Sequence, residues 1–308
     1  MKILVTGARG QLGHELAAAL ASAGTVVALD HDALNLAHGD RVVEIVRSVA
    51  PMLIVNAAAY TAVDRAEEER ASAFSVNANA PAILADEAKR LRALLIHYST
   101  DYVFDGQQTS PYVEDATPHP LNAYGESKLA GERAIASSGA SALILRTSWV
   151  YSLRGSNFLL TMRRLAAERD ELRVVADQVG VPNWARILAQ ATATLVGRGI
   201  PYLTERSGLY HVSASGQATW YEFARAILGE TTKPRIVPIA TADYPLPARR
   251  PAYGVLDSRK FESVFGFALP HWRAALQSCL AGPADAPTSP TAAFGSDKNE
   301  ASNTPTLR

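Results

Sequence analysis

Short apolar segments alternate with amphipathic segments along the first half of the chain. The apolar segments cover residues 3–6, 25–29, 52–55, 93–97 and 142–146, and they have the length and composition of buried parallel strands. Helical spacing of apolar residues lies between them, for example at Leu12, Leu16 and Leu20. This alternation of strands and helices predicts an α/β fold built on a doubly wound parallel sheet.

The regular alternation ends near Trp149. Beyond it, the pattern predicts helices over 157–169, 185–196 and 221–228, a short strand over 208–212 and a proline-rich loop over 238–251. We interpret residues 1–150 as a first domain and residues 151–280 as a smaller C-terminal α/β domain that binds substrate. The helix over 185–196 could instead pack back on the first domain. Pro, Ala, Ser, Thr and Asn predominate over 281–308, which predicts a disordered tail.

A glycine-rich segment follows the first predicted strand. Gly7, Gly10 and Gly13 have the spacing GxxGxxG, with a strand before them and a helix after them. Such a loop lets backbone N–H groups at the helix N-terminus approach a pyrophosphate, so we predict a dinucleotide-binding site. A glycine-bearing turn without a ligand is the alternative.

Two charged residues bear on which dinucleotide binds. Asp30 ends the second predicted strand, at the position where an adenosine ribose hydroxyl is usually bound, and it favours NADH. Arg9 could instead meet the 2′-phosphate of NADPH. The sequence therefore leaves NADH and NADPH open.

Small and polar residues follow the third predicted strand, over 56–61. They would let the backbone pass close beneath a cofactor, although a plain connecting loop has the same composition. Asn77 lies within a predicted helix, where an asparagine is unfavourable unless it has a polar contact. A contact with the backbone and a contact in the active site are equally compatible with that position.

Candidate catalytic groups lie between Tyr98 and Lys128. Thr100 follows the fourth predicted strand, and open α/β sheets bind ligands at the carboxyl ends of their strands. Tyr124 and Lys128 are four residues apart and share a helix face. A phenol has a pKa of about 10 in water, and a neighbouring ammonium would lower the pKa of Tyr124 toward a range useful for acid–base catalysis.

Composition excludes several other classes of protein. The 308 residues carry 30 Lys and Arg and 30 Asp and Glu, so no net charge attracts nucleic acid or an anionic membrane. Cys279 is the only cysteine, which is typical of a reducing compartment. No apolar run has membrane-spanning length, and a strand begins at the first residues without room for a signal peptide. The seven histidines show no metal-ligand spacing. We expect a soluble, cytoplasmic protein.

Together, the motifs resemble the dTDP-4-dehydrorhamnose reductase family of the extended short-chain dehydrogenase/reductase superfamily, whose nucleotide domain is of the Rossmann type. The resemblance extends in order over about residues 1–280. The matching segments are TGARGQLG (6–13), VNAAAYTAVDRAE (55–67), HYSTDYVFDG (97–106), NAYGESKLAGE (122–132), RTSWVY (146–151), NF (157–158), DQVGVP (177–182), GLYHV (208–212) and RRP (249–251).

The resemblance implies a reaction, the last step of dTDP-L-rhamnose synthesis. NADPH or NADH would reduce the C4 ketone of dTDP-4-dehydro-6-deoxy-L-mannose, a dTDP-sugar. Tyr124 would protonate the developing alkoxide, Lys128 would hold the nicotinamide ribose and lower the pKa of Tyr124, and Thr100 would hydrogen-bond the ketone oxygen.

The same resemblance implies binding residues. The cofactor contacts would be Gly7, Gly10, Gln11, Leu12, Gly13, Asp30, Ala59, Tyr60, Thr61, Tyr124 and Lys128. The substrate contacts would be Thr100, Asp101 and Trp149, with Asn157 and Arg250 at the nucleotide diphosphate.

Two departures from the family pattern affect these expectations. Some members bind Mg²⁺ through carboxylates at a dimer contact. Glu15 matches the first of these, but Gln190 lies near the position of the second, so we expect no metal site and either a monomer or a homodimer. Gly254 replaces a serine that usually follows the late Arg-Pro motif, which would loosen one substrate contact.

Three other functions share parts of the pattern. A nucleotide-sugar 4,6-dehydratase would carry Glu where this chain has Tyr102, which argues against it. A 4-epimerase is harder to separate, although Trp149 and the segment 177–182 favour the reductase. A non-catalytic regulatory subunit on the same fold would not need Thr100, Tyr124 and Lys128 together.

Overall fold

The computed structural model describes residues 1–229 and 233–282. Its centre is a six-stranded sheet in the order β10-β5-β4-β3-β1-β2, with every neighbouring pair parallel. The strands are β1 (Lys2–Thr6), β2 (Thr25–Leu29), β3 (Leu53–Asn56), β4 (Leu94–Thr100), β5 (Ala142–Thr147) and β10 (Gly208–His211). The predicted α/β class with a doubly wound parallel sheet is therefore confirmed.

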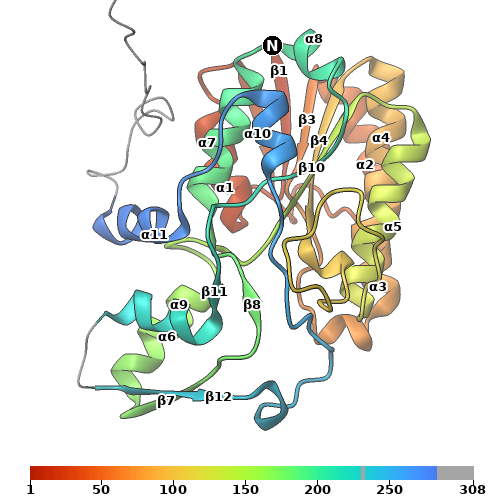
Figure 1. The fold of residues 1–308 in the computed structure, drawn as a ribbon. Coiled ribbons are helices and arrows are strands. Elements are labelled where there is room, and N and C mark those ends of the chain that lie inside the picture. Colours follow the sequence, from red (N-terminus) through yellow and green to blue (C-terminus); the bar gives the residue numbers. More distant parts are fainter. Residues whose placement is uncertain (230–232, 283–308) are drawn as a thin grey trace, which may run out of the picture.

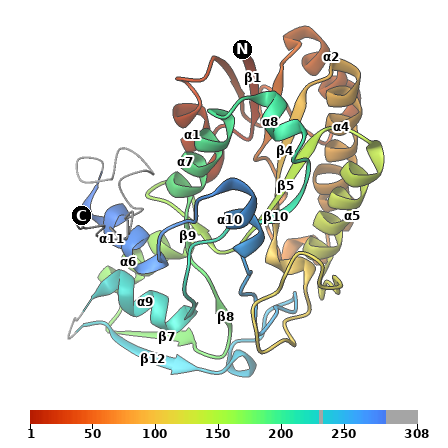
Figure 2. The same ribbon diagram turned by 45° about the horizontal axis from the view of Figure 1, so that its top comes forward.

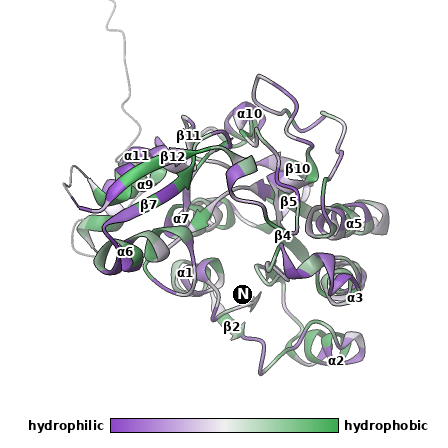
Figure 3. Ribbon diagram, turned by 90° about the horizontal axis from the view of Figure 1, so that it is seen from below, coloured by the Kyte–Doolittle hydropathy of each residue, from purple (hydrophilic) through white to green (hydrophobic). Residues whose placement is uncertain are grey.

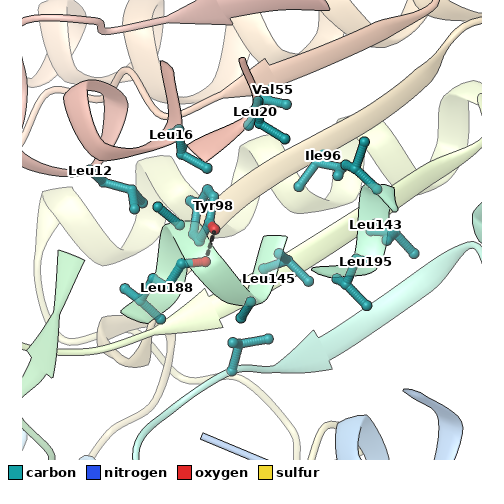
Figure 4. Packing of buried hydrophobic residues seen from close by; sticks show 14 of the residues in the cluster. Leu12, Leu16, Leu20, Val55, Ile96, Tyr98, Leu143, Leu145, Leu188 and Leu195 are labelled. Carbon is teal, nitrogen blue, oxygen red and sulfur yellow. Dashed lines mark hydrogen bonds between the residues drawn. The ribbon is translucent and has the colours of Figure 1, made fainter. Parts of the chain in front are cut away.

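Successive residues of each central strand pack into different layers. Ile3 and Val5 of β1 lie in one core, whereas Leu4 lies in the core on the opposite face. This period of two follows from the pleat of a strand, and apolar residues at every position mark a sheet covered on both faces. All seven residues of β4 are buried. In Figure 4, Tyr98 extends from β4 into the first of these cores, and its hydroxyl donates to the carbonyl oxygen of Leu188 at 3.3 Å.

Helices cover both faces (Figures 1 and 2). The helices packed in the core with Ile3 are α1 (Gln11–Ala19), α7 (Ala185–Val196), α8 (Ile200–Thr204) and α10 (Arg259–Phe265). Those packed with Leu4 are α2 (Gly39–Val49), α4 (Ala80–Leu91) and α5 (Ala123–Ser138). The short helix α3 (Arg70–Phe74) and the π-helix η2 (Ser75–Asn79) precede α4, and 3₁₀ turns lie at η1 (Arg65–Glu67) and η3 (Asp101–Val103). Figure 3 shows hydrophobic and hydrophilic residues together on α2, α3 and α5, as expected of helices that cover a core on one side.

A smaller group of elements lies beyond the carboxyl ends of the strands (Figure 1). Its strand pairs are β6 (Val150–Tyr151) with β9 (Asn183–Trp184), β7 (Glu171–Val175) with β12 (Arg235–Ile239), and β8 (Val179–Gly180) with β11 (Ala218–Thr219). Its helices are α6 (Phe158–Glu168), α9 (Trp220–Leu228) and α11 (Trp272–Ala281), with a 3₁₀ turn η4 (Thr241–Asp243). A separate core that includes Tyr151, Leu159, Phe223 and Trp272 holds this group together.

Four elements from beyond residue 150 lie with the large sheet, namely α7, α8, β10 and α10. The strand predicted over 208–212 is β10, which pairs with β5 as an edge strand, because Gly208 lies beside Leu143 and His211 beside Arg146. Helix α7 packs on α1, as the sequence had left possible, and α10 packs on β10. The chain thus returns to the first unit twice, and a division at residue 150 stays a prediction.

Two further expectations concern the C-terminal residues and membrane-spanning segments. Helix α11 extends to Ala281, and residues 283–308, where a disordered tail is expected, lie outside the described residues. Within residues 1–229 and 233–282, no helix combines the length and the apolar character needed to cross a bilayer.

Candidate functional site

The glycine loop turns tightly between β1 and α1. Gly7 has φ +73°, and a Cβ atom built there would lie 2.8 Å from the Cα of Ala58. A Cβ on Gly13 would lie 2.1 Å from the carbonyl oxygen of Gly7. Glycine is therefore required at both positions, because the loop passes against its neighbouring loop and against its own helix. No side chain caps the N-terminus of α1, so its first N–H groups remain available to an anion.

A cavity of about 530 Å³ lies at this loop and at the carboxyl ends of the strands. It brings together eight of the predicted cofactor residues, and Gly13, Asp30 and Tyr60 lie outside its lining. The lining comprises Gly7, Arg9, Gly10, Gln11, Leu12, His31, Leu34, Asn35, Leu36, Ala57, Ala58, Ala59, Thr61, Val76, Tyr98, Ser99, Tyr124, Lys128, Thr147, Val150, Gly155 and Ser156.

Asp30 and Arg9 contact each other beside this cavity. The Nε atom of Arg9 lies 2.7 Å from Oδ2 of Asp30, and the same guanidinium contacts Asp32. The backbone amides of Ala33 and Asp32 donate to Oδ1 of Asp30. The amide of Ala33 and the charge of Arg9 lower the pKa of Asp30, so this carboxyl is ionised at neutral pH.

Tyr124 lies in the first turn of α5, where Asn122 caps the helix by accepting from the amide of Gly125 at 2.8 Å. Its ring packs edge-on against Tyr102, with centroids 5.5 Å apart. Burial raises the pKa of Tyr124 to about 12, and a hydrogen bond with Thr100 acts in the opposite direction. The expectation that Lys128 lowers this pKa is wrong for the net shift, because loss of hydration outweighs the other influences. The phenol is thus a protonated acid at neutral pH.

Lys128 lies one helical turn after Tyr124, and both side chains reach the cavity. The residue is 2% exposed, and its Nζ donates to the carbonyl oxygen of Tyr98 at 2.6 Å. Burial lowers the pKa of Lys128 to about 8, and the charge of Glu132 opposes this shift. The ammonium therefore predominates at neutral pH but titrates close to it.

Thr100 and Asp101 follow β4 and are 6% and 2% exposed. The hydroxyl of Thr100 donates to Oδ1 of Asp101 at 3.1 Å, and burial raises the pKa of Asp101 to about 7. Gly254 covers the same carboxyl, since a Cβ atom there would lie 2.5 Å from Oδ2 of Asp101. The sequence suggested that glycine at position 254, in place of serine, loosens a substrate contact. In the structure, the missing side chain leaves room for the carboxyl of Asp101.

Trp149 adopts a left-handed backbone conformation, with φ 43°. Its indole stacks on Trp220, with ring centroids 3.5 Å apart and planes 8° from parallel, and packs on Gly180. Trp220 in turn donates from Nε1 to the side-chain oxygen of Gln178 at 3.2 Å. Trp149 is not among the cavity-lining residues. Trp220 and Gln178 support it, and nothing in their spacing along the sequence indicated this.

Asn157 and Arg250 are both engaged within the protein. Asn157 caps α6 and donates from Nδ2 to the side-chain oxygen of Gln11 at 2.8 Å, so it joins the smaller unit to the glycine loop. Arg250 donates from both terminal nitrogens to Asp64, at 2.9 and 2.7 Å. The diphosphate contacts expected of these two residues stay predictions.

Asn77 supports the cavity from outside. Its side chain accepts from the amide of Tyr60 at 2.8 Å and donates to the carbonyl oxygen of Tyr60 and to the hydroxyl of Ser127, both at 3.0 Å. It therefore fastens the loop with Ala59 to α5 next to Lys128. The sequence signal was an asparagine inside a helix, which left open whether its contact was with the backbone or in the active site.

The family's carboxylate metal site does not fit the residues present. Glu15 on α1 pairs with Arg186 on α7 at 3.0 Å, so a guanidinium neutralises this carboxylate. Within the ranges that the structure describes, no group of three or more His, Cys, Asp or Glu residues could hold a metal ion.

Comparisons with known proteins agree on one family. A family profile described as the RmlD substrate binding domain matches residues 1–284. The dTDP-4-dehydrorhamnose reductase of Burkholderia thailandensis is 48% identical over 295 residues, covering 91% of this chain and 98% of the relative. The reductase of the same name from Escherichia coli K12 is 44% identical, with 91% and 97% covered.

Similar solved structures include a reductase of the same name and an enzyme of another activity with the same fold. The dTDP-4-dehydrorhamnose reductase of Bacillus anthracis in complex with NADP superimposes with a TM-score of 0.85 at 35% identity, over 91% of this chain and 98% of that one. A Thermus thermophilus UDP-glucose 4-epimerase in complex with NAD has a TM-score of 0.76 at 20% identity, over 91% and 98%, and this likeness shows the Rossmann-type fold alone. The chain belongs to the dTDP-4-dehydrorhamnose reductase family of NAD(P)H-dependent oxidoreductases.

Proposed function

We propose that the protein reduces the C4 ketone of dTDP-4-dehydro-6-deoxy-L-mannose to dTDP-L-rhamnose with NADPH or NADH. The observation that carries the proposal is that Tyr124 and Lys128 line one cavity with the glycine loop, next to Thr100 at the end of β4. Family membership alone would not require these groups to lie together. A regulatory subunit would have no use for them.

The cavity fits a dinucleotide. Gly7 and Gly10 line it without side chains, and the uncapped N-terminus of α1 offers N–H groups to a pyrophosphate. Gln11, Leu12, Ala59 and Thr61 would complete the walls, and Asp30 with Arg9 would meet the adenosine ribose. When bound, the reduced nicotinamide supplies the hydride. The remaining chemistry belongs to side chains of this chain.

Tyr124 would act as the general acid. Its raised pKa keeps the phenol protonated before the reaction, and an alkoxide formed at C4 is a strong enough base to take that proton. Thr100 hydrogen-bonds with Tyr124 and would also face the ketone oxygen, where negative charge develops. The Lys128 ammonium would hold the nicotinamide ribose and stabilise the phenolate that remains after proton transfer.

Asp101 and Trp149 are proposed to contact the sugar, and Asn157 and Arg250 the nucleotide diphosphate. Asp101 adjoins the hydroxyl of Thr100, which supports a position beside the reacting carbon. Arg250 is held next to Tyr102 by Asp64, so its charge is fixed on the same side as Tyr124. A 4-epimerase remains the second candidate on fold, but at 48% and 44% identity the relatives named above are reductases.

The test supplies the enzymatically prepared 4-keto sugar nucleotide and follows the absorbance of the reduced cofactor. Wild type is expected to consume the cofactor, and Tyr124→Phe to be slower by about 10²- to 10⁴-fold, the range of general acid catalysis. Tyr202→Phe is a matched control, because that hydroxyl contacts Val264 outside the cavity lining. Equal inactivity of the wild type and Tyr124→Phe with every 4-keto sugar nucleotide would refute the reductase.

We also propose that the protein acts in the cytoplasm as a monomer or homodimer, with a dTDP-sugar as its partner and without nucleic acid. The single cysteine and the balance of 30 basic and 30 acidic residues support this setting. Light scattering coupled to gel filtration would decide the oligomeric state, and any form larger than a dimer would contradict the proposal.

A further inference from the structure

A row of buried polar side chains crosses the sheet behind Lys128. Thr6, Asn56 and His97 lie side by side on β1, β3 and β4 and are 1%, 1% and 0% exposed. Thr6 Oγ1 lies 2.6 Å from Asn56 Oδ1, Asn56 Nδ2 lies 2.9 Å from His97 Nδ1, and His97 Nε2 lies 3.4 Å from Lys128 Nζ. Of these four residues, only Lys128 lines the cavity, so the reaction described above gives the other three no task.

The contacts of Lys128 divide between the strand and the cavity. An ammonium has three N–H donors. One donates to the carbonyl oxygen of Tyr98 at 2.6 Å and a second faces Nε2 of His97 at 3.4 Å, so consecutive residues of β4 hold the amine from behind. The third N–H is left for the cavity that Lys128 lines.

His97 must have one particular tautomer to accept from the ammonium. Burial, and then the charge of Lys128, lower the pKa of His97 well below its usual range, so the ring is neutral with one donor and one acceptor. If Nε2 accepts, Nδ1 carries the hydrogen and needs an acceptor on Asn56. In the orientation shown, the Thr6 hydroxyl donates to Oδ1 of Asn56. Turning over the Asn56 amide presents Oδ1 to His97 and Nδ2 to Thr6, whose hydroxyl then accepts, and it requires the 2.6 Å contact to lengthen slightly. In the opposite tautomer, an N–H would face the ammonium with no acceptor between them.

We infer that His97 is a positioning residue for Lys128: as the Nδ1–H tautomer, backed by Asn56, it accepts from the ammonium and directs the remaining N–H into the cavity. The inference rests on the catalytic role proposed for Lys128.

Two substitutions separate the two nitrogens of the ring. His97→Gln can place a side-chain oxygen near the Nε2 position and keep the acceptor for Lys128, whereas His97→Asn can keep only the contact with Asn56. We expect His97→Gln to retain kcat within about threefold of wild type, and His97→Asn to lose about 10- to 100-fold in kcat with smaller changes in KM, as for loss of a hydrogen bond to a charged group. Equal losses in the two variants, or a larger loss in His97→Gln, would overturn the inference. Thermal unfolding midpoints would show that both fold.

The pH profile distinguishes positioning from a merely structural role. Glu132 on the same helix acts on the charge of Lys128, and His97 on β4 faces its Nζ. Tyr124 lines the same cavity and is itself influenced by Asp101 in η3, and Arg146 on β5 pairs with Glu132. Loss of a neutral acceptor disfavours the ammonium, so the basic limb of kcat/KM should move to lower pH in His97→Asn and stay in place in His97→Gln. If the maximal kcat/KM of His97→Asn decreases but its basic limb stays at the same pH as in wild type, the result would count against the inference.

A spectroscopic readout is independent of turnover. Nitrogen-15 correlation spectra of histidine-labelled wild type should show a neutral Nδ1–H tautomer for the signal that disappears in His97→Asn. An Nε2–H tautomer would overturn the inference. Lys128→Met separates the catalytic role proposed for Lys128 from the positioning role inferred for His97. Full activity in that variant refutes both, whereas an inactive Lys128→Met beside an unimpaired His97→Asn refutes only the role of His97.

Discussion

The guanidinium of Arg9 lies 2.7 Å from the carboxylate of Asp30, measured from Nε to Oδ2. From the sequence, Arg9 favoured binding of NADPH and Asp30 favoured binding of NADH. The structure places the two side chains in contact. Arg9 is 72% exposed and lines the cavity, whereas Asp30 is fixed by two backbone amides. One side chain can therefore turn toward a 2′-phosphate while the other remains available to a ribose hydroxyl.

Arg9→Ala should change cofactor preference rather than overall activity. We expect kcat/KM with NADPH to fall about 10-fold, because a charge-assisted contact to the 2′-phosphate is lost, and kcat/KM with NADH to change less than about threefold. Initial rates with each cofactor at saturating sugar nucleotide measure the ratio. An unchanged ratio would mean that Arg9 does not contact the adenosine end.

The pH dependence of the reaction should follow Lys128. Its pKa is lowered to about 8, so the fraction of ammonium decreases as pH rises through that value. If the ammonium is the active form, kcat/KM should decrease about tenfold per pH unit above the pKa, whereas Tyr124, with a pKa of about 12, stays protonated over the same range. Lys128→Arg would abolish this limb, since a guanidinium does not titrate there. A limb that persists in Lys128→Arg would assign it to another group.

Removal of one partner from the buried pair Glu132–Arg146 should strongly destabilise the fold. The side chains are 6% and 2% exposed, and their closest atoms lie 2.6 Å apart. Glu132→Gln leaves a buried guanidinium without its counter-charge, and we expect the free energy of unfolding to fall by about 3 kcal/mol. Urea denaturation measures the change.

Glu168→Gln is the matched control for that measurement. It breaks the exposed pair of Glu168 with Arg164, whose nearest atoms are 2.8 Å apart, and should lower the free energy of unfolding by no more than about 0.5 kcal/mol. Similar losses in both variants would show that burial does not govern the larger effect.

Trp220→Ala should weaken sugar-nucleotide binding without affecting the cofactor. Trp220 stacks on Trp149 and is not part of the cavity lining. Loss of the stack frees the Trp149 indole, so we expect KM for the sugar nucleotide to rise about 3- to 10-fold and KM for the cofactor to stay constant. Trp220→Phe, which keeps an aromatic face, should be intermediate. A rise in the cofactor KM alone would place the effect elsewhere.

Local patterns in the sequence determined the main elements and part of the site. Successive residues such as Leu4 and Val5 pack on opposite faces of the sheet because neighbouring side chains of a strand point in opposite directions. The tight turn at Gly7 and Gly10 between a strand and a helix, and the placement of Tyr124 and Lys128 one turn apart, likewise follow from short-range backbone geometry, although the contact of Gly7 with Ala58 is tertiary. These features, with the motif order that indicates the family, could be read from residues close together in the chain.

Tertiary packing decided what those patterns could not express. Edge strand β10 joins β5 across a long separation, at Gly208 and Leu143, and Asn157 reaches Gln11 from the smaller unit. The pKa of Tyr124 rises although a lysine follows it, because the surrounding segments remove water from the phenol. Pairing between distant segments and the dehydration of a side chain both depend on which parts of the folded chain come into contact. Those contacts are long-range, so the local pattern of residues does not determine them.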